Sequence, residues 1–307
     1  MSVRQGGATV GALAIDIGAE SGRAILGRFD GRRVTLEAIH RFPNEPVHLP
    51  TGLHWDALRL HHEIERGLAA AGAAGDPPRS LGIDTWGADF GLLDRTGALL
   101  GNPVHYRDGR TVGMPERASA VVTWPDLYAT TGIQHLRLNT LYQLLAMADS
   151  PLLATAEHLL LMPDLFAYWL GGEVANERTN ASTTQLYDPV RRDWACDLIG
   201  RLGLPARLFH QPLVEPGTAL GPLLPSVAAR TGLRPGTELV AVGSHDTASA
   251  VAAVPAMGND WAYVSSGTWS LVGVETTAPI LTAEARDANL TNEVGVGGTI
   301  RLLKNVM

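Results

Sequence analysis

The sequence places an acidic residue, Asp16, where an apolar run meets a turn of small residues. Asp16 lies in the run Val10–Ile17, which leads into Gly18-Ala19-Glu20-Ser21-Gly22-Arg23. Glycines let a ligand approach the backbone, successive N–H groups of such a turn form an anion site, and a neighbouring carboxylate can hold Mg²⁺. The alternative is an ordinary hairpin turn in which Asp16 caps backbone amides. The turn does not match the Gly-rich dinucleotide fingerprint, and the chain contains no P-loop.

A second acidic residue, Asp246, follows the apolar run Leu239–Val242 within Gly243-Ser244-His245-Asp246-Thr247. Ligands of open α/β sheets usually lie beyond the ends of strands, and an Asp there can take a proton from a hydroxyl nucleophile. The alternative is that Asp246 is the N-cap of a short helix expected over Thr247–Ala253. His245 by itself is expected to position or pack rather than to act as a base.

Two further carboxylates, Asp84 and Asp89, enclose Thr85-Trp86-Gly87-Ala88. Carboxylates beside an aromatic ring and a glycine suit the binding of a polyol or sugar. Paired carboxylates also occur in glycosidases, which gives an alternative function of a different class. Trp86 can equally be a core residue.

Composition excludes several classes of protein. The 24 Lys and Arg against 31 Asp and Glu give a net charge of −7 without a basic block, which argues against a nucleic-acid-binding face. A single cysteine, Cys196, excludes a disulfide within the chain and a cysteine-rich metal site. The first ten residues contain no apolar run, and no stretch is apolar for long enough to span a membrane, so we expect a cytoplasmic protein with no membrane partner.

The pattern of apolar residues predicts an α/β protein that opens with an antiparallel meander. The apolar runs are Val10–Ile17, Arg23–Phe29 and Arg33–His40. The first two are separated by the turn at residues 18–22 and the last two by Asp30-Gly31, which is a strong hairpin signal. Amphipathic helices are expected from Trp55 to Gly72, around Leu141–Ala148 with Asn139 or Thr140 as cap, and over Leu165–Leu170.

The remaining elements are shorter. A strand is expected at Leu81–Ile83, an ordered but irregular connection over Pro205–Pro235, and a second strand–turn–strand unit from Trp261 to Val274. That unit is similar in pattern to the opening hairpin. The length of 307 residues favours two domains.

Several blocks of the sequence, taken together and in chain order, resemble the FGGY family of carbohydrate kinases. The blocks are DIGAESGR (Asp16–Arg23), GIDTWGADF (Gly82–Phe90), YRDGRT (Tyr106–Thr111), NTLYQ (Asn139–Gln143), LLMPD (Leu160–Asp164), TNASTTQ (Thr179–Gln185), SHDTASAV (Ser244–Val251), SSGTWS (Ser265–Ser270) and TNEV (Thr291–Val294). The resemblance implies an actin-like, hexokinase-like (ribonuclease H-like) fold of two α/β domains around a cleft. It also implies Mg²⁺-dependent phosphoryl transfer from ATP to the 1-hydroxyl of L-rhamnulose, in L-rhamnose breakdown.

The resemblance assigns roles to individual residues. Asp246 is the general base, and Asp16 lies near Mg²⁺. Two hairpin turns face the ATP phosphates, through Ala19, Glu20, Ser21, Gly22 and Arg23 in the first and Thr268 in the second. The residues that line the sugar site are Gly87, His245, Asp246, Thr247 and Asn305.

The chain departs from the family pattern at its end, because members of the family continue well beyond residue 307 and hold adenosine with a later glycine-rich segment. We therefore expect a complete N-terminal domain over residues 1–246 and only the start of a C-terminal domain over 247–307. Such a chain should show little or no ATP-dependent phosphorylation. The strands at Trp261–Val274 should expose apolar faces and an open edge, so the chain should tend to aggregate or dimerise through its C-terminal end. The alternatives are a non-catalytic sugar- or nucleotide-binding protein of the same fold, and a kinase of a related ketose or polyol.

Overall fold

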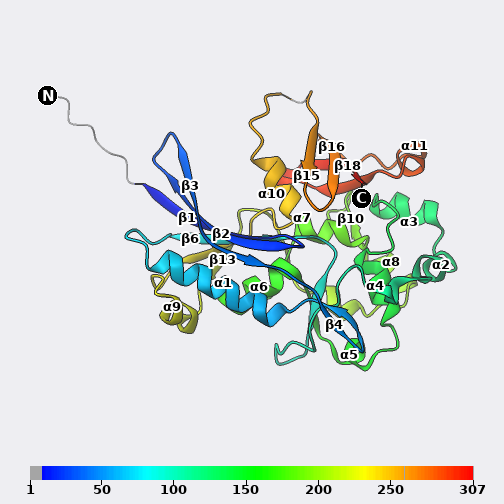
Figure 1. Ribbon diagram of the computed structural model, residues 1–307. Coiled ribbons are helices and arrows are strands. Elements are labelled where there is room, and N and C mark those ends of the chain that lie inside the picture. The colour runs from blue at the N-terminus through cyan, green and yellow to red at the C-terminus, as the bar shows by residue number, and fades with distance from the viewer. Residues whose placement is uncertain (1–8, 259, 307) are drawn as a thin grey trace.

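The computed structural model describes residues 9–258 and 260–306, and its largest sheet has six strands in the order β13-β14-β6-β1-β2-β3 (Figure 1). In chain order these are β1 (Val10–Ile17), β2 (Ser21–Phe29), β3 (Val34–Pro43), β6 (Ser80–Thr85), β13 (Ala219–Pro222) and β14 (Glu238–Val240). The strands β14, β6 and β1 are parallel, whereas β1-β2-β3 form the expected antiparallel meander. The Asp30 carboxylate closes the second turn by accepting the amides of Arg32 and Arg33, both at 2.8 Å.

Three helices cover one face of this sheet: α1 (Ala57–Gly72), α6 (Met162–Gly171) and α9 (Pro225–Thr231) (Figure 1). The predicted stripe on α1 is buried, with Leu60, Ile64 and Leu68 fully covered. The strand alternation turns Ile15 and Ile17 toward this core, and therefore turns Asp16 to the opposite face of the sheet. The helix predicted over Leu165–Leu170 is α6, which ends at a left-handed glycine, Gly172 (φ 86°).

A second core lies where shorter elements pack beside the sheet. Its helices are α2 (Met114–Ser119), α3 (Trp124–Thr131), α4 (Thr140–Ala146), α5 (Pro151–Thr155), α7 (Arg178–Ala181) and α8 (Cys196–Arg201). Its strand pairs are β7 (Phe90–Leu93) with β8 (His158–Leu161), β9 (Asn176–Glu177) with β12 (Leu213–Val214), and β10 (Tyr187–Asp188) with β11 (Asp193–Trp194). A separate hairpin, β4 (Val47–Leu49) with β5 (Gly52–His54), is exposed or half-buried. Short 3₁₀ turns are η1 (Gly109–Thr111), η2 (Ser182–Thr184), η3 (Ala206–Phe209) and η4 (Val296–Gly298). The expected cap of α4 is Asn139, although its side chain instead bonds Gln134 and Gln185.

The expectation of an irregular connection over Pro205–Pro235 is wrong in part. This stretch contains β13, an edge strand of the main sheet, and α9. Pro225 stands in the first turn of α9, where its missing N–H costs no hydrogen bond, so the proline starts a helix rather than interrupting one. The helix packs Val227 into the core of the main sheet.

The last part of the chain forms a four-stranded antiparallel sheet in the order β15-β16-β18-β17. Its elements are β15 (Tyr263–Ser266), β16 (Ser270–Thr276), β17 (Thr291–Val294) and β18 (Ile300–Val306), with α10 (Asp246–Ala252) before it and α11 (Ala283–Asp287) within it. It lies above the open face of the main sheet in Figure 1. One face packs Val251, Tyr263 and Leu271 together, whereas Val264 and Val272 are exposed, as the sequence predicts for this hairpin.

Candidate functional site

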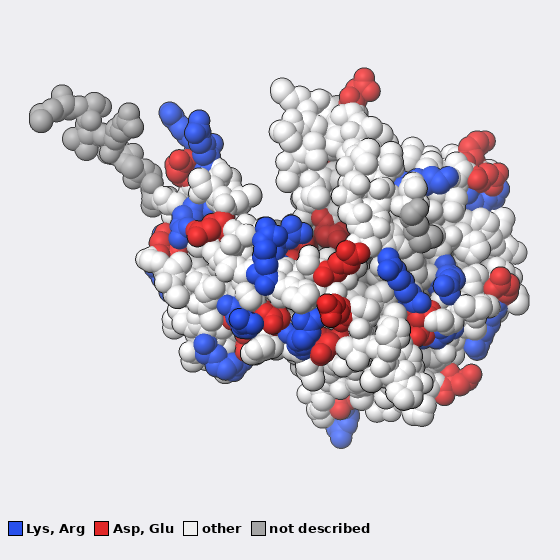
Figure 2. Space-filling view, in the orientation of Figure 1, with Lys and Arg blue, Asp and Glu red and all other residues white. Residues whose placement is uncertain are grey.

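A pocket of about 500 Å³ is lined by residues of both sheets. Figure 2 shows the surface hollowed between the part that carries the first strands and the part that carries β15, β16 and β18. Basic and acidic side chains are interspersed on this view of the molecule. The two hairpins that the sequence singled out, one from each sheet, both contribute to this pocket.

The strand pairing brings three carboxylates to the pocket. Asp16 of β1 and Asp84 of β6 are direct partners across neighbouring parallel strands. The amide of Thr85 donates to the carbonyl of Ser244 at 2.9 Å, which places Asp246 beside them. Burial raises the pKa of Asp84 well above its ordinary value, and Asp16 and Asp246 raise it further. The three groups therefore form one electrostatic unit at the base of the pocket.

The first hairpin turn is held by a buried side chain. The amide of Gly18 donates to the carbonyl of Ser21 at 2.9 Å, and Asn44 Nδ2 donates to the carbonyl of Gly18 at 2.8 Å. Of the predicted phosphate-facing residues, Ala19, Glu20, Ser21 and Arg23 line the pocket. Gly22 does not line it, because its Cα faces Phe42, whose ring would lie 2.2 Å from an added Cβ.

Arg23 and Asp16 form an ion pair at the mouth of this turn, with Nε and Oδ2 3.1 Å apart. Burial raises the pKa of Asp16, Arg23 opposes that shift, and Asp246 adds to it. A phosphate that entered here would meet one guanidinium and the backbone of a tight turn, which is a suitable environment for an anion.

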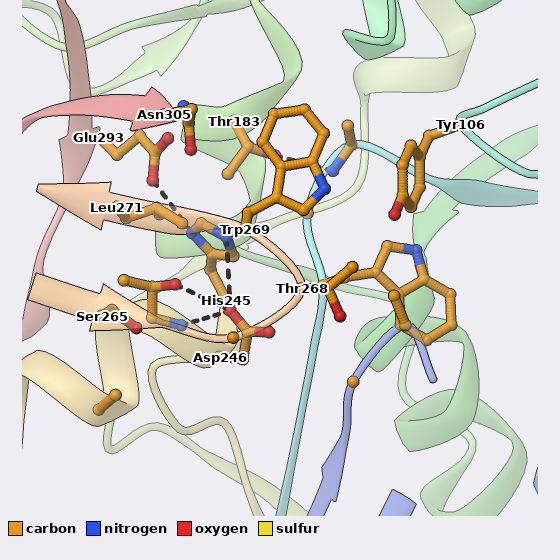
Figure 3. A pocket seen from close by; sticks show the side chains of 18 of the residues that line it. Tyr106, Thr183, His245, Asp246, Ser265, Thr268, Trp269, Leu271, Glu293 and Asn305 are labelled. Atoms are coloured by element: carbon orange, nitrogen blue, oxygen red, sulfur yellow. Dashed lines mark hydrogen bonds and ion pairs between the residues drawn. The ribbon is translucent and has the colours of Figure 1, made fainter. Parts of the chain in front are cut away.

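The second hairpin presents its turn to the same pocket. Ser265, Gly267, Thr268 and Trp269 line it, and the amide of Gly267 closes the turn by donating to the carbonyl of Trp269 at 2.8 Å. Figure 3 shows Thr268 and Asp246 within the same pocket. The sequence predicted Thr268 at this place from its resemblance to the family.

The predicted sugar-facing residues all line the pocket: Gly87, His245, Asp246, Thr247 and Asn305. The N-cap position of α10 is His245, so Asp246 is the first helical residue and not the cap that the alternative interpretation required. Its Oδ1 accepts the amide of Thr247 at 2.5 Å and the hydroxyl of Thr247 at 3.0 Å. The Asn305 Nδ2 donates to Gln134 Oε1 at 3.1 Å.

Aromatic side chains form a wall of the pocket, made of Trp86, Tyr106 and Trp269. Tyr106 lies in the turn before η1 and Trp269 in the turn between β15 and β16, and their rings contact edge to face with centroids 6.3 Å apart (Figure 3). Trp86 is both a core residue and a pocket residue, because it is only 6% exposed and still lines the pocket.

Asp89 supports this wall from behind and does not line the pocket. Its Oδ2 accepts Trp55 Nε1 at 2.6 Å, Trp86 Nε1 at 3.0 Å and the Tyr106 amide at 3.1 Å. Its other oxygen accepts Gln143 Nε2 at 2.7 Å. With this carboxylate fully buried, Asp84 and Asp89 do not face a substrate together, as the glycosidase alternative requires.

Asp89 gives a prediction for the pH dependence of stability. Burial raises its pKa to about 6, although Trp55, Gln143 and Trp86 lower it by hydrogen bonding. The unfolded chain ionises this carboxyl near pH 4, so the folded protein retains the proton longer and the free energy of unfolding falls as pH rises from about 4 to about 6. Asp89→Asn lacks this titration.

Relative to Asp89→Asn, the free energy of unfolding of the unsubstituted chain should fall by up to about 3 kcal/mol as pH rises from about 4 to about 6. Chemical denaturation followed at several pH values measures it. A difference that stays constant from pH 4 to pH 7 would show that the Asp89 pKa is not raised in the folded protein.

Some pocket residues were outside the predicted site. Asn139, Thr183 and Glu293 line it, as do Tyr106 and Trp269. All five stand in blocks that carry the family resemblance, which was the available signal, but nothing in their own spacing distinguished them from core residues.

Two negative findings apply to residues 9–258 and 260–306. These residues contain no group of three or more His, Cys, Asp or Glu side chains arranged to hold a metal ion. Among the same residues, no helix combines the length and the apolar character needed to cross a membrane. The first eight residues, part of the segment in which no signal peptide is expected, lie outside this description.

This chain is similar in sequence to known proteins. Two curated relatives are rhamnulokinases, from Bacteroides thetaiotaomicron and Enterococcus faecalis; each is 45% identical over 96% of this chain. The chain spans 61% and 59% of the length of these two proteins.

The fold is also present in a solved structure. A ligand-bound xylulose kinase from Lactobacillus acidophilus superposes with a TM-score of 0.85 at 14% identity, over 96% of this chain and 60% of that one. The model of the FGGY family of carbohydrate kinases, N-terminal domain, matches residues 11–253. With its hairpins and its pocket in place, this chain belongs to the FGGY family of carbohydrate kinases.

Proposed function

We propose that the pocket binds L-rhamnulose together with ATP and supports transfer of the γ-phosphoryl group to the 1-hydroxyl of the sugar. The observation that carries the proposal is the convergence of both hairpin turns and Asp246 on one pocket. The rhamnulokinases that are 45% identical to this chain support L-rhamnulose as the sugar. A requirement for ATP would place the activity in the cytoplasm.

Asp246 is the proposed general base. The sugar hydroxyl gives its proton to the Asp246 carboxylate, its oxygen bonds to the γ-phosphorus, and the bond from that phosphorus to the bridging oxygen breaks to release ADP. The transition state spreads charge over the equatorial phosphoryl oxygens, so the protein acts by positioning and by neutralising charge. Arg23 and the backbone of residues 19–21 do this from one sheet, and Thr268 from the other. Gly22 contributes through the shape of the turn.

The sugar would lie between His245, Thr247 and Asn305 on one side and Gly87 with the aromatic wall on the other. Neighbouring carboxylates and amides can bond its hydroxyls, while an indole face covers its apolar side. We further propose that the N-terminal unit comprises residues 1–246 and that residues 247–307 begin a second unit. The separate sheets before and after α10 support this division.

The decisive experiment incubates the chain, in excess over L-rhamnulose, with ATP and Mg²⁺, and follows ADP and sugar phosphate in a single turnover. Protein excess makes even slow transfer visible. We expect ADP to form only when the ketose is present, with a matching amount of L-rhamnulose 1-phosphate. Sugar binding by calorimetry without any product would instead assign a binding role, and turnover that ignores ATP would contradict a kinase.

Asp16 is the proposed contact to Mg²⁺, which when bound neutralises phosphate charge. Its carboxylate lines the pocket beside the phosphate-facing turn, and Mg²⁺ commonly takes few protein ligands and several waters, so one carboxylate fits this role. Asp16→Ala should raise the Mg²⁺ concentration needed for half-maximal transfer and slow the reaction. A Mg²⁺ titration checks this, with Asp76→Ala, an exposed carboxylate outside the pocket, as the control. An unchanged titration would remove Asp16 from the metal site.

Trp86 is the proposed contact to the 6-methyl group of the sugar. One methyl group in an apolar pocket discriminates by about 1–3 kcal/mol, so L-fructose, which carries a hydroxymethyl group there, should be a poor substrate and not an inactive one. The ratio of kcat/KM for the two ketoses measures this, and Trp86→Ala should reduce the ratio. Equal values in the unsubstituted chain would show that the methyl group is not sensed.

A further inference from the structure

A buried charge network forms part of the wall of the proposed sugar pocket: His245 and Glu293 line the pocket, and the proposed phosphoryl transfer uses neither Glu293 nor Arg301. It joins Glu293 of β17, Arg301 of β18 and His245 at the start of α10. Arg301 is fully buried, and the Glu293 and His245 side chains are 6% and 9% exposed. Charges so far from solvent are costly unless each has a partner, which makes their arrangement informative.

The three side chains meet around one carboxylate oxygen. Glu293 Oε2 lies 3.1 Å from His245 Nδ1 and 3.1 Å from Arg301 Nη2. Arg301 Nη2 lies 3.0 Å from the same Nδ1. The other ring nitrogen of His245, Nε2, is 3.7 Å from Asp246 Oδ1, so the ring lies between Glu293 and the proposed base (Figure 3).

The contacts around Nδ1 favour one tautomer of His245. An arginine can only donate, and Nδ1 can only accept from it if Nδ1 is unprotonated. The ionised Glu293 oxygen is the stronger acceptor, and both donors converge on it, so Nδ1–H donates to Glu293 and Arg301 donates to the same oxygen. Burial opposes ionisation of Glu293, but His245 and Arg301 outweigh it and hold the pKa of Glu293 below its ordinary value.

The backbone and the ring of His245 are held from different parts of the molecule. The amide of His245 donates to Thr179 Oγ1 at 3.1 Å, and the preceding residue, Ser244, donates its amide and hydroxyl to Glu177. These partners belong to the segment that packs beside the first sheet. The ring is instead fixed by two strands of the second sheet, so correct placement of the ring requires both parts to be docked.

We propose that Glu293 is a positioning residue: by accepting from His245 Nδ1–H, with Arg301 keeping it charged, it turns His245 Nε2 toward Asp246 and the pocket as a hydrogen-bond acceptor for a sugar hydroxyl. The sugar part of this statement rests on the proposed function. The orientation of the ring and its proposed tautomer do not, because only contacts within the protein support them.

The first test is ¹⁵N NMR of the histidine-labelled chain at neutral pH without ligand, with His245 assigned by its loss in His245→Gln. We expect the pattern of an imidazole protonated at Nδ1. Glu293→Gln should redistribute the hydrogen between the ring nitrogens, because the amide oxygen is a weaker acceptor and Arg301 competes for it. Glu275→Gln, a matched change on β16 outside the pocket, should leave the pattern unchanged.

A ring protonated only at Nε2 in the unsubstituted chain would overturn the proposal, and this measurement remains available if Glu293→Gln does not fold. Arg301→Lys is the conservative variant, because it retains the positive charge beside Glu293. It should retain the Nδ1–H pattern, and a lost pattern in a folded Arg301→Lys protein would also overturn the proposal.

The second test is L-rhamnulose binding by calorimetry. Glu293→Gln should weaken it about tenfold, the loss expected when one hydrogen bond is misplaced, whereas Glu275→Gln should not. Unchanged affinity in a folded Glu293→Gln protein would overturn the positioning role. Absence of L-rhamnulose binding to the unsubstituted chain would count against the proposed function, and the NMR result would then decide the position of the ring by itself.

Discussion

Asp246→Asn is expected to slow phosphoryl transfer about 10²–10⁴-fold, the usual contribution of a positioned general base. The amide cannot take the proton of the sugar hydroxyl at neutral pH. It can still accept from the amide and hydroxyl of Thr247, which Asp246 now bonds at 2.5 and 3.0 Å, so the start of α10 should be retained. Single-turnover transfer and sugar affinity by calorimetry separate the two effects.

The affinity for L-rhamnulose should change much less than the rate, because the amide keeps the size and most of the hydrogen bonding of the carboxylate. The control is Asp287→Asn on α11, which removes an exposed carboxylate outside the pocket. Near-normal transfer by Asp246→Asn would show that the carboxylate serves only the local structure of the helix.

Trp55→Ala should reduce the free energy of unfolding by about 3–5 kcal/mol, the cost of removing a buried aromatic side chain and leaving a cavity. Trp55 is fully buried, and its Nε1 donates to Asp89. The centroid of its ring lies 4.1 Å from that of the Trp86 ring and 4.0 Å from that of the His105 ring. The loss is a large part of the 5–15 kcal/mol typical of a folded domain. Chemical denaturation followed by circular dichroism measures it.

Two further variants separate the causes. Trp55→Phe keeps a six-membered aromatic ring and removes the rest of the indole together with its N–H donor, so it should cost less than Trp55→Ala. Leu58→Ala, on the exposed side of the neighbouring helix, should cost under about 0.5 kcal/mol. If Trp55→Ala cost no more than Leu58→Ala, the aromatic cluster would not support the pocket.

Local features of the chain were predictable because their causes are local. The alternation of β1 and β2, the Asp30-Gly31 turn and the stripe of Leu60, Ile64 and Leu68 each follow from neighbours in sequence. The strand β13 was missed because only pairing with β14 makes Ala219–Pro222 a strand, and neither composition nor periodicity contains that contact. The helix α9 was missed because it lies in a stretch rich in Pro and Gly, and composition does not distinguish a proline that starts a helix, such as Pro225, from one that prevents it.

The candidate site also combines residues that local sequence indicates with residues that only contacts between distant segments bring together. Asp16 and Asp246 were found because each ends a strand-like run, and the resemblance gave their roles. The pairing of Asp16 with Asp84, and the burial of Asp89 behind Trp86, depend on strand register and on packing. Glu293 stands in an ordinary strand pattern, and its importance appears only when β17 and β18 bring it and Arg301 to His245.

The order of the main sheet also bears on how the chain folds. The meander and α1 join residues that are close in sequence, so they can form while later segments are still unfolded or still being synthesised. The pairing of β6 with β14 joins Ser80 to Glu238, and it must close a loop that contains nearly all of the second core. Closing so long a loop is slow, and until it is complete the edge of β6 is exposed. Because Thr85 bonds Ser244 just beyond this pairing, the pocket takes its shape only when this last strand has docked.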